Sequence, residues 1–133
     1  MRLKTVLASA IAICMLTACE NIFEDDGLEP DGSKPSLKIN NPSNNQSIST
    51  TQGLRVNVTV VDKDQIKDLE FTVIGSNSET ALVKFKKFPA RTVVEFDTTI
   101  TIQGVTPGEY KLQVAASDKR TNLEKREINF TVK

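Results

Sequence analysis

The chain has 133 residues with 17 basic and 17 acidic side chains, one tyrosine, no tryptophan and no histidine. Without histidine it lacks the commonest general base and the commonest metal-binding side chain, which argues against catalysis. The charges are unevenly distributed along the chain: residues 20–33 carry six acids and no base, whereas residues 34–133 carry 15 bases and 11 acids. A net charge of +4 spread over a domain is too weak to indicate nucleic-acid binding.

The N-terminus has the pattern of an export signal. Two basic residues precede an apolar run at residues 6–16, which has the length of a signal-peptide core and is too short to span a bilayer. The segment Leu16–Cys19 reads LTAC and resembles the bacterial lipobox. The resemblance implies that residues 1–18 are a cleaved signal peptide and that Cys19 is acylated, with palmitate among its chains, which would anchor the chain in a membrane. An ordinary secretory signal with a chance cysteine is the alternative.

An acidic segment follows Cys19. Residues 20–26 read ENIFEDD and resemble the export signal that sends lipoproteins of Bacteroidetes-type bacteria to the outer face of the outer membrane. A merely solvated acidic linker is the other interpretation. Glycine, proline and charged residues continue to Pro35, which is typical of a flexible linker. Residues 19–33 are therefore predicted to be a lipidated, acidic, flexible tether on the cell surface.

Residues 34–133 predict an all-β domain of about seven strands, because apolar and polar residues alternate with a period of two and no helix-length amphipathic run occurs. A polar connection is expected at 40–52, and Asp62-Lys63-Asp64 is expected to end a strand. The expected strands are centred on 37–39, 54–60, 69–73, 81–85, 94–102, 110–116 and 128–132. Strands at this spacing favour a two-sheet sandwich. Tyr110, placed just after a Pro-Gly corner, is expected to bond its hydroxyl to nearby backbone.

Several segments carry a resemblance to a family. The strand 107–118, PGEYKLQVAASD, is the strongest, and the segments 34–39, 58–62 and 69–71 agree with it. Together they resemble a bacterial Ig-like domain covering nearly all of residues 34–133. The resemblance implies an immunoglobulin-like fold and a role as a spacer, adhesion module or accessory domain. The family pattern often has Gly before Asn in the last loop, where this chain has Arg120-Thr121-Asn122, so the tight turn of that loop is in question.

Three acids form the first candidate site. In a sandwich of this topology the loops holding Asp62, Asp64 and Asp118 lie at the same end, and Ca²⁺ prefers carboxylate and carbonyl oxygens. Calcium is thus the one cofactor that the sequence suggests. Lys63, Lys119 and Arg120 among them count against it, and Asp62 and Asp118 could instead cap the backbone of their loops.

Four bases form the second candidate site: Lys84, Lys86, Lys87 and Arg91. Their functional interpretation is contact with an anionic partner such as lipopolysaccharide phosphate or an acidic glycan. The alternative is a solvated face, or an edge strand that lysines protect against pairing with another sheet.

The pattern as a whole predicts a non-catalytic lipoprotein of the outer membrane whose Ig-like domain binds an unidentified protein or glycan at the cell surface. The alternative is a periplasm-facing structural or inhibitory lipoprotein that docks on another envelope protein. The first strand should begin at the end that carries Asp62 and Asp118. The tether would enter there, so that this end would face the membrane and the loops 40–52, 75–80 and 103–108 would face outward.

Overall fold

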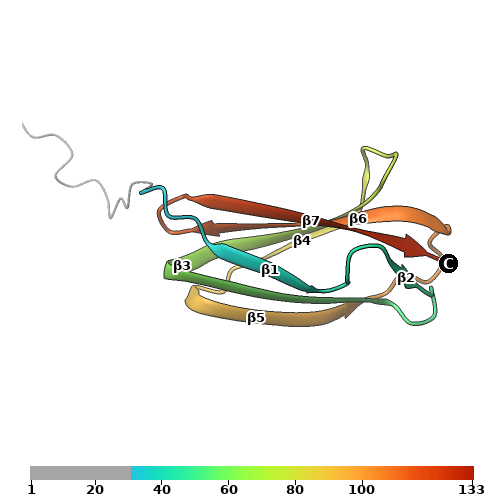
Figure 1. Ribbon diagram of the computed structural model, residues 1–133, viewed down its shortest axis with the longest axis horizontal. Coiled ribbons are helices and arrows are strands. Elements are labelled where there is room, and N and C mark those ends of the chain that lie inside the picture. The colour runs from blue at the N-terminus through green and yellow to red at the C-terminus, as the bar shows by residue number, and fades with distance from the viewer. Residues whose placement is uncertain (1–30) are drawn as a thin grey trace, which may run out of the picture.

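The period-two alternation of the sequence produces seven strands in the computed structural model, which describes residues 31–133 (Figure 1). The predicted signal peptide, Cys19 and the tether up to Pro30 lie outside the described residues. The strands are β1 (Ser36–Asn41), β2 (Gln46–Ile48), β3 (Leu54–Gly75), β4 (Ala81–Lys87), β5 (Arg91–Ile100), β6 (Gly108–Asp118) and β7 (Leu123–Val132). The predicted fold class is confirmed, and the described part of the chain holds no helix that could cross a membrane.

Strand β3 is folded back on itself. Its first arm, residues 54–61, pairs with β1 and β5, and its second arm, residues 66–75, pairs with β4 and β6 and, at Ile66, with the start of β5. The chain reverses direction between the arms, as Figure 1 shows at the left end. The sequence predicted two strands separated at Asp62-Lys63-Asp64, and the structure places the reversal there while the strand assignment continues through it.

The two arms of β3 belong to different layers. Hydrogen bonds link all seven strands into one continuous sheet that folds over at the reversal of β3. The first arm lies with β1 and β5 in one layer, and the second arm lies with β4, β6, β7 and β2 in the other. The short strand β2, which pairs in parallel with the end of β7, lies in the segment 40–52 that was expected to be a connection. That expectation was wrong because a strand of three residues with one buried side chain, Ile48, is too short to produce a recognisable alternation.

The core fills the space between the layers. Both arms of β3 direct every second side chain inward, as strand geometry requires. The ring of Phe71 lies 4.9 Å from that of Phe85 and 4.8 Å from that of Phe96, measured between centroids, so residues of three strands meet there. The fully buried large side chains are Phe71, Phe130, Leu54, Ile66, Leu69, Ile102, Leu112, Val56, Val58, Val60, Val73 and Val114.

Two turns complete the frame. The Tyr110 hydroxyl donates a hydrogen bond to the Thr106 carbonyl at 2.6 Å, which confirms the structural role expected of this tyrosine. In the last loop the Thr121 N–H donates to the Asp118 carbonyl at 3.0 Å, and Thr121 has a φ of 65°. The tight turn therefore forms without glycine, with a β-branched residue in the left-handed region.

Candidate functional site

Asp62, Asp64 and Asp118 meet at the end of the sandwich where the chain enters. Asp62 and Asp64 lie at the reversal of β3 and Asp118 ends β6, and each contributes a carboxylate oxygen to a group whose atoms all lie within 4.8 Å of one another. The topology brings them together because Ile66, next to the reversal, pairs with Asp118. The predicted proximity of these three acids is confirmed.

Two of these carboxylates shape their own loops. Asp62 Oδ1 accepts a hydrogen bond from the Asp64 N–H at 3.0 Å. Asp118 Oδ1 accepts from the N–H groups of Arg120 and Asn122, at 2.8 and 2.9 Å. Such local bonds are what Asp supplies in turns, so the capping role foreseen for Asp62 and Asp118 is confirmed. Capping uses one oxygen of each carboxylate. The second oxygen of Asp118 accepts a hydrogen bond from Asn122 Nδ2 at 3.0 Å, which leaves the second oxygen of Asp62.

The second oxygen of Asp62 is the exceptional atom. Asp62 is 8% exposed and Asp118 is fully buried, and Asp62 Oδ2 is buried with no hydrogen-bond partner among the described residues. Burial raises the pKa of Asp62 above its usual range, and the neighbouring Asp118 carboxylate adds to this rise. Leaving a buried polar atom unpaired costs about 1–3 kcal/mol, and more for a charged group. This oxygen therefore identifies a place where a positively charged species would be favourable.

Two positive side chains, Arg120 and Lys63, lie beside the cluster, and neither forms a hydrogen bond with Asp62 Oδ2. Arg120 Nε donates to Asp64 Oδ2 at 3.1 Å and lies 3.7 Å from Asp31 Oδ2. Lys63 Nζ lies 2.7 Å from the same Asp31 oxygen. The hydrogen bond from Lys63, with smaller contributions from the Ser33 N–H and the Asn122 side chain, holds the pKa of Asp31 well below its usual range. The charges at this end form a network of acids and bases.

Asn122 links the network to the entering chain, and sequence reasoning missed it. Its Nδ2 donates to Asp118 Oδ2 at 3.0 Å and to Asp31 Oδ1 at 2.8 Å, while its Oδ1 accepts from the Gly32 N–H at 3.2 Å. Only 7% of Asn122 is exposed. Residues 31–33, expected to be part of a flexible tether, are thus hydrogen-bonded to the domain. A signal was present, because an asparagine in a polar loop forms such bonds readily.

The four bases of the second candidate site do not form one patch. Lys84 and Lys86 lie on the outer face of β4, where their Nζ atoms are 3.8 and 3.6 Å from the Glu70 carboxylate. Lys87 lies on the opposite side of the strand, with its Nζ 6.0 Å from the centre of the Phe85 ring. Arg91 begins β5, in register with Ile66. The structure therefore brings two of the four bases together around an acid that partly neutralises them.

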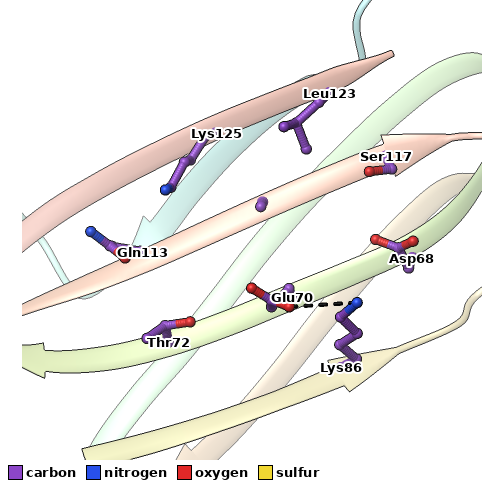
Figure 2. A pocket seen from close by; sticks show the side chains of 9 residues that line it. Asp68, Glu70, Thr72, Lys86, Gln113, Ser117, Leu123 and Lys125 are labelled. Atoms are coloured by element: carbon purple, nitrogen blue, oxygen red, sulfur yellow. Dashed lines mark ion pairs between the residues drawn. The ribbon is translucent and has the colours of Figure 1, made fainter. Parts of the chain in front are cut away.

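A shallow hollow of about 330 Å³ lies on the outer face of the second sheet (Figure 2). Figure 2 shows Asp68 and Glu70 of β3, Lys86 of β4 and Lys125 of β7 around it. Short side chains on β6, Ala115 and Ser117, create the depression between these longer ones. No sequence pattern indicated this hollow beyond the outward polar residues of each strand. Its lining contains both acidic and basic side chains, which could accept hydrogen bonds from a polar partner and donate hydrogen bonds to it.

The end opposite the cluster carries further open hollows between loops. The β3–β4 turn faces the corner before β6 across a space of about 400 Å³, lined by residues 75–78, 80, 82 and 107–110. The segment 50–53 faces Thr99, Thr101 and Gln103 across about 320 Å³. The three connections expected to share this end are therefore neighbours. Their linings are rich in Ser, Thr, Gln and Asn, which suit hydrogen bonding to a polar ligand.

Comparisons with known proteins agree with this architecture. A model of the bacterial Ig domain family matches residues 35–114. Structural similarity extends to the fibronectin(III)-like modules of Clostridium thermocellum CbhA, with a TM-score of 0.51 and 19% identity over 76% of this chain and 47% of that one. A search of curated proteins found no match.

Two enzymes contain a similar fold. OgpA of Akkermansia muciniphila gives a TM-score of 0.55 at 13% identity, over 79% of this chain and 30% of OgpA. A superoxide reductase (neelaredoxin) of Ignicoccus hospitalis, in a form with one substitution, gives 0.52 at 16% identity, over 76% of this chain and 82% of the reductase. The chain thus spans less than half the length of OgpA and of the CbhA modules. Identities this low establish a shared fold and carry no activity to this chain.

Proposed function

Because the chain belongs to the bacterial Ig domain family, we propose that it is a non-catalytic binding module of the bacterial cell envelope, anchored by lipid at Cys19 and exposed at the cell surface. Ig-like domains are sandwiches whose loops and sheet faces serve as contact surfaces. The pattern of an export signal, the lipobox resemblance and the acidic segment after Cys19 support the location. The polar hollows on one sheet face and at one end of the sandwich support a binding role.

The observation that carries the proposal is the place where the chain enters the domain. Asp31 is held against Lys63 and Asn122, at the same end as the start of β1. The segment between Cys19 and Asp31 is short, and it reaches ~40 Å at full extension. A domain held this closely by its entry end would turn that end toward the membrane, and the loops around residues 50–53 and 75–80 away from it.

Anchoring is tested by metabolic labelling with a palmitate analogue in a lipoprotein-producing host. Wild-type chain should incorporate label and fractionate with membranes, and Cys19→Ser should lose both. Cys14→Ser is the matched control, because it makes the same change inside the predicted signal peptide and should leave labelling intact. Equal labelling of wild type and Cys19→Ser would refute the anchor.

Surface exposure is tested by protease treatment of intact cells with immunoblotting for the domain. Loss of the domain while a periplasmic control protein survives is the expected result. Protection of the domain until the outer membrane is permeabilised would refute surface exposure. It would favour the alternative of a periplasm-facing module, whose partner should then be sought by cross-linking in the periplasm.

A further inference from the structure

Asp62, Asp64 and Asp118 have the geometry of an incomplete oxygen cage. Their nearest carboxylate oxygens lie within 4.8 Å of one another, a separation that two ligands of one ion also show, because metal–oxygen distances of roughly 2.3–2.6 Å place such ligands up to about 5 Å apart. Local hydrogen bonds from the Asp64 N–H and from the N–H groups of Arg120 and Asn122 fix Asp62 and Asp118 in place. The cluster is therefore preorganised by its own loops.

An acidic cluster by itself is a common surface feature, and one further observation distinguishes this one. Asp62 is more than nine-tenths buried, and its Oδ2 lacks any partner within the described residues. Of the bases nearby, Lys63 contacts Asp31, whereas Arg120 contacts both Asp31 and Asp64 and so partly neutralises one of the three carboxylates. We propose that Asp62, Asp64 and Asp118 bind a divalent cation of the calcium type, with Asp62 Oδ2 as a direct ligand.

The donor set selects the class of ion. All three side chains supply oxygen, which suits Ca²⁺ and Mg²⁺ and is a poor set for transition metals that prefer nitrogen or sulfur. Ca²⁺ accepts six to eight oxygens in irregular geometry, whereas Mg²⁺ demands a near-ideal octahedron. Three carboxylates on two loops leave several positions for water or backbone carbonyls, and a mixed oxygen set of this kind is one that Ca²⁺ accepts.

The same geometry offers one competing occupant, a proton shared between Asp62 and Asp118. Burial, and after it the charge of the neighbouring Asp118, raise the pKa of Asp62, as expected for a buried carboxylate beside a like charge. The two occupants would have different effects on the stability of the fold. A cation would stabilise the fold in proportion to its concentration at neutral pH, whereas a shared proton would stabilise it only as the pH falls.

The first experiment uses the full chain, purified in mild detergent and stripped with EGTA at about pH 7.5. Calcium chloride is added while thermal unfolding is followed by circular dichroism, and calorimetric titration gives the stoichiometry. Ca²⁺ at about 100 times its Kd should raise the Tm by roughly 10 °C or more, from the mass-action effect and the size of the domain. One ion should bind per chain, and sodium chloride of equal ionic strength should not reproduce the shift.

Two variants locate the site. Asp62→Asn removes the charge but keeps an oxygen for the Asp64 N–H, and Asp64→Asn removes a ligand that caps no loop. Each should weaken Ca²⁺ binding at least tenfold. Asp68→Asn is the matched control, because Asp68 lines the hollow on the sheet face and should leave binding unchanged. If Asp62→Asn fails to fold, Asp64→Asn and the titration of the wild-type chain still show whether Ca²⁺ binds at this cluster.

Three results would overturn the proposal. One is a Tm that changes by less than about 1 °C with millimolar Ca²⁺ while no saturable heat is measured. Another is a stabilisation that Asp62→Asn, Asp64→Asn and Asp68→Asn all retain, since the ion would then bind elsewhere. The third is stabilisation on acidification from about pH 7.5 to about 5 without any response to Ca²⁺, which would assign the Asp62 oxygen to a shared proton.

Discussion

Replacing Thr121 by glycine should stabilise the domain. Thr121 has a φ of 65° in the β6–β7 loop, a conformation that costs an L-residue roughly 1–2 kcal/mol. Glycine would avoid that cost, but its greater freedom in the unfolded chain would return about 0.5–1 kcal/mol. The expected net gain is about 0.5–1 kcal/mol, which for a domain of this size corresponds to a rise in Tm of roughly 2–8 °C.

The measurement is urea unfolding followed by circular dichroism, with a thermal scan as a second probe. Thr92→Gly is the matched control, because Thr92 is an exposed threonine within β5, where glycine should cost about 1 kcal/mol. The two substitutions should therefore shift stability in opposite directions. If Thr121→Gly destabilises the domain as much as Thr92→Gly does, the hydrogen bond from Thr121 Oγ1 to the Arg120 carbonyl outweighs the backbone strain, and the reasoning fails.

Two further predictions concern the core and the entering chain. Phe71→Ala should cost about 3–5 kcal/mol in urea unfolding, since the ring is fully buried against Phe85 and Phe96; a loss below about 1 kcal/mol would show that the aromatic cluster does not hold the layers together. The depressed pKa of Asp31 means that its contacts stabilise the entry segment above about pH 4 and are lost as the pH falls through the lowered value. The Ser33 amide resonance, whose N–H donates to Asp31, should titrate with a midpoint below the ordinary value of about 3.9; a midpoint at or above that value would contradict the ion pair with Lys63.

The sandwich could be predicted from the sequence because its main determinant is local. Alternation such as Val56, Val58 and Val60 marks one buried face directly, and the position of Tyr110 after a corner indicated its hydrogen bond. The proximity of Asp62 and Asp118 also followed, because topology alone places their loops at one end. The first two inferences needed only local sequence, and the third needed only the order of the strands.

The remaining features depend on three-dimensional details that no local pattern contains. The four bases are dispersed over different surfaces: Lys84, Lys86, Lys87 and Arg91. Lys84 and Lys86 lie on one face of β4 beside Glu70 of the neighbouring strand, whereas Lys87 lies on the other face and Arg91 begins β5. The hollow of Figure 2 arises from differences in side-chain length across adjacent strands. The role of Asn122 could not be predicted, because the sequence does not show that residues 31–33 lie against the β6–β7 loop.

Asn122 connects the acidic cluster to the entering chain, so one substitution should affect both. Asn122→Ala would leave Asp118 Oδ2 without its donor and remove the acceptor of the Gly32 N–H. We expect a loss of about 1–3 kcal/mol in urea unfolding, because a buried carboxylate oxygen becomes unpaired. The Gly32 amide should also exchange with solvent faster, as measured by NMR.

The matched control for this change is Asn129→Ala, an exposed asparagine on β7, which should change stability by less than about 0.5 kcal/mol and leave Gly32 exchange unchanged. If Asn122→Ala destabilises the domain without altering Gly32 exchange, residues 31–33 are held by Lys63 and Arg120 rather than by Asn122. If it accelerates exchange and lowers stability together, the loop that closes the acidic cluster is also what fixes the entry segment. An ion bound among Asp62, Asp64 and Asp118 would then also restrict how the domain is oriented on its tether.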